Sequence, residues 1–217
     1  MNKLIIDIET IPNQNIDDDI KPKFNESTVK LGNVKDQEKI NAKIESSKKE
    51  FESGLTKRMS IESNYCQIIS LGYIEVNEQN NEVSRGVLFD ELNDKSIIEQ
   101  FDKIYTGQTI IGWNSKNFDI PIIWKRAILN NTKNPVYNYQ YLCNPYNDNS
   151  IDLMRTWNGS TNYGKMSDCA KLLGIECKTG LDGSMIYDAY KDKKFDEIKA
   201  YNLEDCQCTL DIYKRIY

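Results

Sequence analysis

Two acidic side chains near the start of the chain stand at a spacing that suits metal chemistry. Asp7 and Glu9 belong to the mostly apolar run Ile5-Ile6-Asp7-Ile8-Glu9-Thr10. If this run is a strand, its alternation places Ile5, Asp7 and Glu9 on one face. Two carboxylates on a buried strand repel each other and are costly to remove from water, and a cation held by both would remove that cost. Oxygen ligands favour Mg²⁺ or Mn²⁺. The alternative is that the strand ends there and both acids reach water.

Two further acids occupy positions where helices are expected. Asp119 lies close to the N-terminus of a helix predicted over 118–129, where a negative side chain is favoured, so it could also be a simple first-turn acid. In a long helix predicted over 196–216, Tyr201 and Asp205 lie about 40° apart on a mostly apolar face. A carboxylate there needs a metal ion or a basic partner; the alternative is a surface Asp beside a packed Tyr.

The amino-acid composition excludes several kinds of catalytic site. The 217 residues include no histidine, which excludes a Ser-His-Asp triad, a Cys-His dyad and histidine metal ligands. Mean hydropathy is −0.63, and no apolar run approaches the ~18–20 residues of a membrane span. No secretory signal is evident, so a cytoplasmic location is expected. The six cysteines include no Cys-x-x-Cys pair, and we expect all six to be small core or surface residues.

The charge is unevenly distributed along the chain. The net charge is −5, but residues 21–58 hold ten Lys/Arg and six Asp/Glu, a balance of +4, which leaves −9 elsewhere. Two divalent cations among four carboxylates would cancel about four negative charges, so an acidic composition does not exclude a polyanionic substrate. The basic segment could guide a nucleic-acid backbone, and a solvated charged helix is its plainer interpretation.

The elements that must position these residues alternate between strands and helices. Residues 13–60 are expected to be an inserted excursion, helical over about 36–53, and residues 131–149 a loop. Ser167 is expected to cap one helix, and Ser184 to start a short one. The strands are predicted at 3–9, 66–76, 83–89, 109–113 and 151–154, and the remaining helices at 94–105, 118–129, 167–173 and 196–216. This order predicts a mixed sheet flanked by helices.

Taken together and in this order, the motifs resemble one superfamily. Asp7-x-Glu9, then Asn114-x-x-x-Phe118-Asp119, then Tyr201-x-x-x-Asp205 resemble the DnaQ-like 3′–5′ exonucleases of the ribonuclease H-like fold, in the subgroup with Tyr in the third motif. The first two motifs look most like the proofreading domain of family-B DNA polymerases, and the whole chain looks closest to stand-alone predicted exonucleases related to that domain. Segments 151–154, 172–175 and 178–183 also fit that group, whereas the long 20–60 segment departs from it.

The resemblance implies an α/β fold with a ribonuclease H-like, mixed five-stranded sheet. It implies a single exonuclease domain over 1–217, with a Lys/Glu-rich helical insertion at about 20–60. The carried-over site residues are the metal ligands Asp7, Glu9, Asp119 and Asp205 for two Mg²⁺ or Mn²⁺ ions, Tyr201 near the attacking water, Ile8, Thr10 and Asn114 at the terminal nucleotides, and Lys178 at a phosphate.

The implied reaction is hydrolysis at the 3′ end of DNA, preferably single-stranded, with release of nucleoside 5′-monophosphates by a two-metal-ion mechanism. Trp113, Trp157 and Tyr163 are candidates for stacking on bases, although packing in the core is the plainer interpretation of each. A separate DNA polymerase or replication protein is a candidate partner, and no membrane is expected. Two alternatives stay open: an RNA 3′–5′ exonuclease of the same fold, and an inactive nucleic-acid-binding domain.

Overall fold

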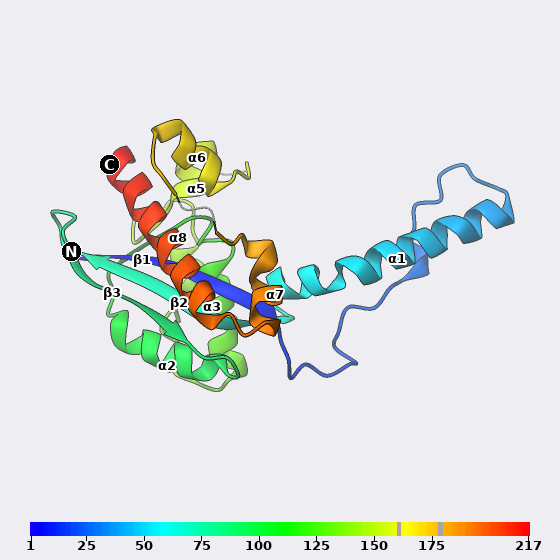
Figure 1. Ribbon diagram of the computed structural model, residues 1–217, viewed down its shortest axis with the longest axis horizontal. Helices are drawn as coiled ribbons and strands as arrows, with labels where there is room; N and C mark the ends of the chain where they lie inside the picture. The colour runs from blue at the N-terminus through cyan, green and yellow to red at the C-terminus, as the bar shows by residue number, and fades with distance from the viewer. Residues whose placement is uncertain (160–161, 178–179) are drawn as a thin grey trace.

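A five-stranded mixed sheet forms the centre of the computed structural model, which describes residues 1–159, 162–177 and 180–217 (Figure 1). Its strands lie in the order β3-β2-β1-β4-β5. They span β1 Lys3–Pro12, β2 Cys66–Val76, β3 Glu82–Phe89, β4 Thr109–Gly112 and β5 Ser150–Asp152. β1 pairs antiparallel with β2 and parallel with β4. The predicted mixed sheet flanked by helices is therefore confirmed.

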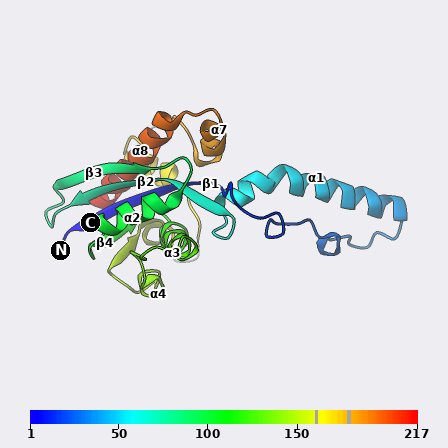
Figure 2. The same cartoon turned by 90° about the horizontal axis from the view of Figure 1, so that it is seen from below.

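β1 is the central strand because both of its faces are apolar at its start. Leu4, Ile6 and Ile8 pack against α2 (Asp94–Ile104) and α3 (Asp119–Leu129). Ile5 packs on the opposite face against α8 (Phe195–Ile216). Figure 2 shows α8 on one side of the sheet and α2 and α3 on the other. Strand alternation thus directs the positions that follow Ile5 on its face towards α8.

The arm, residues 13–61, is the part of the chain that leaves the body of the molecule (Figures 1 and 2). Its helix α1 spans Gln37–Ile61 and is longer than the stretch predicted over 36–53. Asp36 caps its N-terminus, where its side chain accepts from two backbone N–H groups. The ring of Phe51 in α1 lies 5.8 Å from that of Phe24, in the segment that runs outwards before the helix. The arm rejoins the body beside the site region, where the Thr10 hydroxyl donates to the Ser60 carbonyl at 2.5 Å.

Among the described residues, four shorter α-helices and two 3-10 turns, Glu26–Thr28 and Gly183–Met185, complete the fold. The helices are α4 Tyr139–Leu142, α5 Leu153–Asn158, α6 Met166–Leu173 and α7 Ile186–Lys191. Ser184, expected to start a short helix, lies in the second of the two turns, directly before α7. α4 lies within the stretch expected to be a loop. Leu153 and Met154, expected in a strand, are helical because the side chain of Asp152 caps α5. Ser167 lies inside α6 and does not cap it: the helix already includes Met166, whose sulfur accepts from the hydroxyl of Thr209 at 3.2 Å.

The cysteines also depart from expectation. Cys177 and Cys208 form a disulfide between the segment after α6 and helix α8, with Cα atoms 5.3 Å apart. Packing of α6 against α8 brings the two residues together, which no local pattern around either cysteine could show. Cys66, Cys143, Cys169 and Cys206 are free, as expected. Among the described residues, no helix combines the length and the apolarity that crossing a membrane requires.

Candidate active site

Three carboxylates from opposite ends of the chain meet between β1 and α8. Oxygen atoms of Asp7, Glu9 and Asp205 all lie within 4.8 Å of one another. β1 supplies the first two on the Ile5 face, and α8, which packs across β1 and β2, supplies the third. Glu9 is only 8% exposed. Asp7 and Asp205 are half-buried. Closely spaced carboxylate oxygens form a donor set that fits a divalent cation.

Asp119 approaches the same place from the open edge of β1. β4 pairs with β1 only from Lys3 to Ile5, so the edge beyond is free of β4. There the Asp119 carboxylate accepts the backbone N–H of Ile8 at 3.1 Å and is 2% exposed. It lies outside the group of three but close enough for its charge to raise the pKa of Asp7 and of Glu9. We call Asp7, Glu9, Asp119 and Asp205 the carboxylate cup.

Burial raises the pKa of every carboxyl group in the cup, and repulsion by other members of the cup raises it further for Asp7 and Glu9. For Asp7 and Glu9, burial and then the neighbouring acids place the pKa well above its ordinary range. Burial raises the pKa of Asp119 to about 7 and that of Asp205 to about 6. The metal-free cup therefore holds protons near neutral pH. Because carboxylate ligands must be deprotonated, a cation that binds there would release protons.

Tyr201 lies one helical turn before Asp205 on α8, and its hydroxyl is hydrogen-bonded to the Asp205 carboxylate. Burial, followed by the charges of Glu9, Asp205 and Asp7, raises its pKa far above the ordinary range of a tyrosine. The phenol thus stays protonated at any physiological pH. It can donate a hydrogen bond beside the cup but cannot act there as a base.

The four residues expected to bind substrate, Ile8, Thr10, Asn114 and Lys178, differ in how far their polar groups are free to contact a ligand. Ile8 is packed in the core, with its N–H bound to Asp119. The hydroxyl proton of Thr10 is used on Ser60, which leaves only acceptor capacity for a ligand. Asn114 directly follows Trp113 after β4 and adopts a left-handed conformation with φ of 61°. Lys178 lies outside the described residues.

Asp152 is a residue of this region whose role the sequence did not indicate. Its carboxylate accepts the backbone N–H of Asn114 at 3.0 Å and that of Lys116 at 3.1 Å. With 4% exposure, it anchors the loop between β4 and α3 to the end of β5. Because that loop leads directly to Asp119, Asp152 supports the open edge of the cup. Its place within the short strand predicted over 151–154 was the one available signal.

Asn202 is the second such residue. It is fully buried on α8 and donates from Nδ2 to Oδ2 of Asp7 at 2.6 Å. Its neighbour Tyr201 belongs to the Tyr-x-x-x-Asp motif, and Leu203 belongs to an apolar stripe of the helix. The sequence around Asn202 does not indicate which residue its side chain contacts.

Among the aromatic candidates, the indole N–H of Trp113 is used in packing, since it donates to the carbonyl of Gly164 at 3.0 Å. Trp157 and Tyr163 are 41% and 77% exposed and stay available to a ligand.

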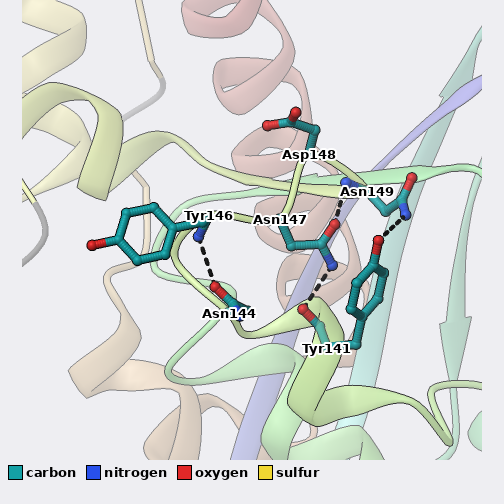
Figure 3. Close-up of a pocket in the computed structure, with 6 residues that line it drawn as sticks. All are labelled: Tyr141, Asn144, Tyr146, Asn147, Asp148 and Asn149. Atoms are coloured by element: carbon teal, nitrogen blue, oxygen red, sulfur yellow. Dashed lines mark hydrogen bonds between the residues drawn. The ribbon is translucent and has the colours of Figure 1, made fainter.

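A separate cavity of about 290 Å³ is lined by the loop before β5 and contains no residue of the cup. Figure 3 shows hydrogen bonds among several of its lining residues, as where Asn147 donates to the Tyr141 carbonyl at 2.6 Å. This cavity is distinct from the candidate active site.

Comparison with protein families gives one match, to a family described as "predicted 3′–5′ exonuclease related to the exonuclease domain of PolB", over residues 60–217. The match includes Asp119, Tyr201 and Asp205, and it begins after Asp7 and Glu9, which the arm separates from it. A search among curated proteins gave no match.

Solved structures share the fold at low sequence identity. The family B DNA polymerase of Pyrobaculum calidifontis is 14% identical, with a TM-score of 0.58 over 100% of this chain and 24% of the polymerase. E. coli exonuclease I in complex with a dT13 oligonucleotide is 10% identical, with a TM-score of 0.52 over 99% of this chain and 40% of the exonuclease. A product-bound exonuclease I is 11% identical, with a TM-score of 0.52 over 99% of this chain and 43% of the exonuclease. The chain therefore spans less than half of each, and the similarity shows that its sheet has the exonuclease, ribonuclease H-like fold.

Proposed function

Because the chain belongs to the family of predicted 3′–5′ exonucleases related to the exonuclease domain of PolB, we propose that it hydrolyses the terminal phosphodiester bond at the 3′ end of single-stranded DNA. The products are nucleoside 5′-monophosphates. The observation that carries the proposal is the convergence of Asp7, Glu9 and Asp205 within 4.8 Å, beside Asp119. Such a cluster is costly to bury without a cation.

The proposed cofactors are two Mg²⁺ or Mn²⁺ ions held by the carboxylate cup. Bound there by Asp7, Glu9, Asp119 and Asp205, such ions would supply Lewis acidity for the attacking water and charge stabilisation for the departing 3′ oxygen. The carboxylates of the cup supply the deprotonated oxygen ligands. Because the pKa of each carboxyl group is raised, its deprotonation depends on binding of the cation.

Tyr201 is assigned the positioning of the attacking water. Its raised pKa keeps the phenol protonated, so it donates a hydrogen bond and does not remove the proton from water. Its hydrogen bond to Asp205 fixes the ring beside the cup.

DNA is preferred over RNA in this proposal. Exonuclease I of E. coli, which shares the fold, has been solved with dT13 and dA16 oligonucleotides. The exposed rings of Trp157 and Tyr163 would suit unstacked bases. The test is parallel digestion of 3′-labelled DNA and RNA of one sequence with Mg²⁺ and with Mn²⁺. Faster digestion of RNA would favour the RNA exonuclease, and binding without any release would favour an inactive nucleic-acid-binding domain.

The arm is proposed to guide the strand towards the cup. It rejoins the body at Thr10, the residue after Glu9, and carries more basic than acidic residues over 21–58. The test is the salt dependence of oligonucleotide binding after replacing exposed lysines of α1 by Gln at Lys39, Lys48 and Lys49. Each lost phosphate contact should reduce the slope by about 0.7 for a single strand. The exposed Lys103 and Lys214, replaced by Gln, are the control, and an unchanged slope in the α1 variant would contradict the proposal.

A separate DNA polymerase or replication protein is the partner that would present such 3′ ends. The fold shared with part of a family B DNA polymerase supports this choice. The test is co-purification of the chain with a polymerase, with and without DNA. A complex that persists without DNA is direct, and a complex that is lost without DNA is bridged by the DNA.

A further inference from the structure

We propose that Ser70 and Asn202 form a hydrogen-bond chain that fixes the orientation of the Asp7 carboxylate and so prepares the cup for its cations. Asn202 is a positioning residue in this chain, since it acts through Asp7. The inference rests on the proposed function, because the cations in question are those of that site.

Asn202 holds Asp7 at two points. Its Nδ2 donates to the carboxylate Oδ2 at 2.6 Å and to the backbone carbonyl of the same residue at 3.1 Å. Asn202 is 0% exposed, so water cannot replace either bond. A rotation of the Asp7 side chain away from α8 would break a charge-assisted hydrogen bond whose donor is fully buried.

Ser70 determines which end of the Asn202 amide faces Asp7. Its hydroxyl, also 0% exposed, donates to Oδ1 of Asn202 at 2.6 Å. An amide has one donor end and one acceptor end, so a donor at Oδ1 leaves the NH₂ group for Asp7. Without Ser70 the amide could turn over and present its oxygen to the carboxylate, which would repel it.

β2 provides the room for this arrangement as well as the hydroxyl. In the register of β1 with β2, Ser70 lies opposite Glu9 and Gly72 opposite Asp7. A Cβ atom at Gly72 would lie 3.0 Å from the Asn202 carbonyl oxygen and 2.9 Å from Sγ of Cys206. The glycine therefore permits the close approach of α8 to the sheet on which the Asn202 contacts depend.

The consequence concerns cation affinity. One lone pair of Asp7 Oδ2 is used by Asn202, and the remaining lone pairs of both oxygens stay available to a cation. The carboxylate is held in place before any cation arrives, so less conformational freedom is lost on binding. Loss of a hydrogen bond that orients a metal ligand typically costs about 10–100-fold in affinity.

The test is Mn²⁺ binding to the full-length, metal-free protein, followed by the electron paramagnetic resonance signal of free Mn²⁺. Asn202→Leu keeps the side-chain volume and removes both hydrogen bonds, and we expect its dissociation constant for Mn²⁺ to rise at least about tenfold. Ser70→Ala should weaken binding in the same direction. Because Ser70 acts only through Asn202, adding Ser70→Ala to Asn202→Leu should weaken binding no further.

Asn147→Ala is the matched control, because it removes a comparably buried and hydrogen-bonded amide from the loop before β5. It should bind Mn²⁺ as the wild type does. Wild-type affinity in Asn202→Leu, or losses that add in the double variant, would overturn the inference. If Asn202→Leu does not fold by circular dichroism, Ser70→Ala decides, and an unchanged affinity there overturns it. A wild-type protein that binds no Mn²⁺ would overturn the proposed function and this inference together, whereas the preceding results would overturn the inference alone.

Discussion

Asp205→Asn separates the electrostatics of the cup from its packing. The amide keeps the shape of the side chain, and its oxygen can still accept the hydroxyl of Tyr201. What it removes is one of the converging negative charges. In the metal-free protein the pKa of Asp205 is about 6, against an ordinary value of 3.8. The variant therefore tests whether burial and repulsion make the empty cup costly to charge.

The sign and size of the effect follow from that pKa. A raised pKa means that the folded protein holds a proton that the unfolded chain has already released, so the free energy of unfolding falls as pH rises from about 4 to above 6. A rise of the pKa from 3.8 to about 6 corresponds to about 3 kcal/mol. Asp205→Asn should then be more stable than the wild type by up to about 3 kcal/mol above pH 7 and nearly equal to it near pH 4.

The assay is urea unfolding in the presence of a chelator at about pH 4.5 and about pH 7.5. Asp211→Asn is the control, because Asp211 lies on the same helix, accepts from Gln207 at 2.9 Å and belongs to no metal-binding group. Only the change in Asp205→Asn beyond that in Asp211→Asn is assigned to the cup. A stability difference for Asp205→Asn that does not change with pH, or a variant less stable than the wild type at about pH 7.5, would refute the reasoning.

Two further predictions concern the packing around the site. Arg126→Met leaves the buried Asp94 without its ion pair, whose Nε–Oδ2 distance is 2.5 Å, and should cost about 3–5 kcal/mol in urea unfolding. Lys133→Met, which loses an exposed pair, should cost no more than about 1 kcal/mol, and equal losses would contradict the assignment. Cys177→Ser should cost the oxidised protein about 3–4 kcal/mol by opening the bridge to Cys208. A reductant should lower the Tm of the wild type and not of this variant; six titratable thiols in the oxidised wild type would count against the bridge.

Local patterns were enough to propose the members of the cup. Strand alternation places Asp7 and Glu9 on one face, and one helical turn joins Tyr201 to Asp205. Neither strand alternation nor helical periodicity shows that these side chains meet at one place. That convergence was expected only because the combined motifs resemble a known superfamily. The geometry of Asp7, Glu9 and Asp205 now gives that expectation a physical basis.

The supporting residues could not be predicted, because their partners are distant in the sequence. Asn202 contacts a carboxylate 195 positions away, and Asp152 a backbone N–H 38 positions away. The apolar stretch 151–154 was too short for its period to distinguish strand from helix, and the cap made by Asp152 decides it. The Cys177–Cys208 bridge likewise depends on how α6 packs against α8.

Release of label from a 3′-labelled, single-stranded DNA oligonucleotide in the presence of Mn²⁺ tests most directly whether the cup acts on a 3′ end. The wild type should release the label from the first time point as a nucleoside 5′-monophosphate, and folded Asp7→Asn should release none. Label that stays on the oligonucleotide, label that leaves in fragments of several nucleotides, or equal release by Asp7→Asn would contradict the assignment.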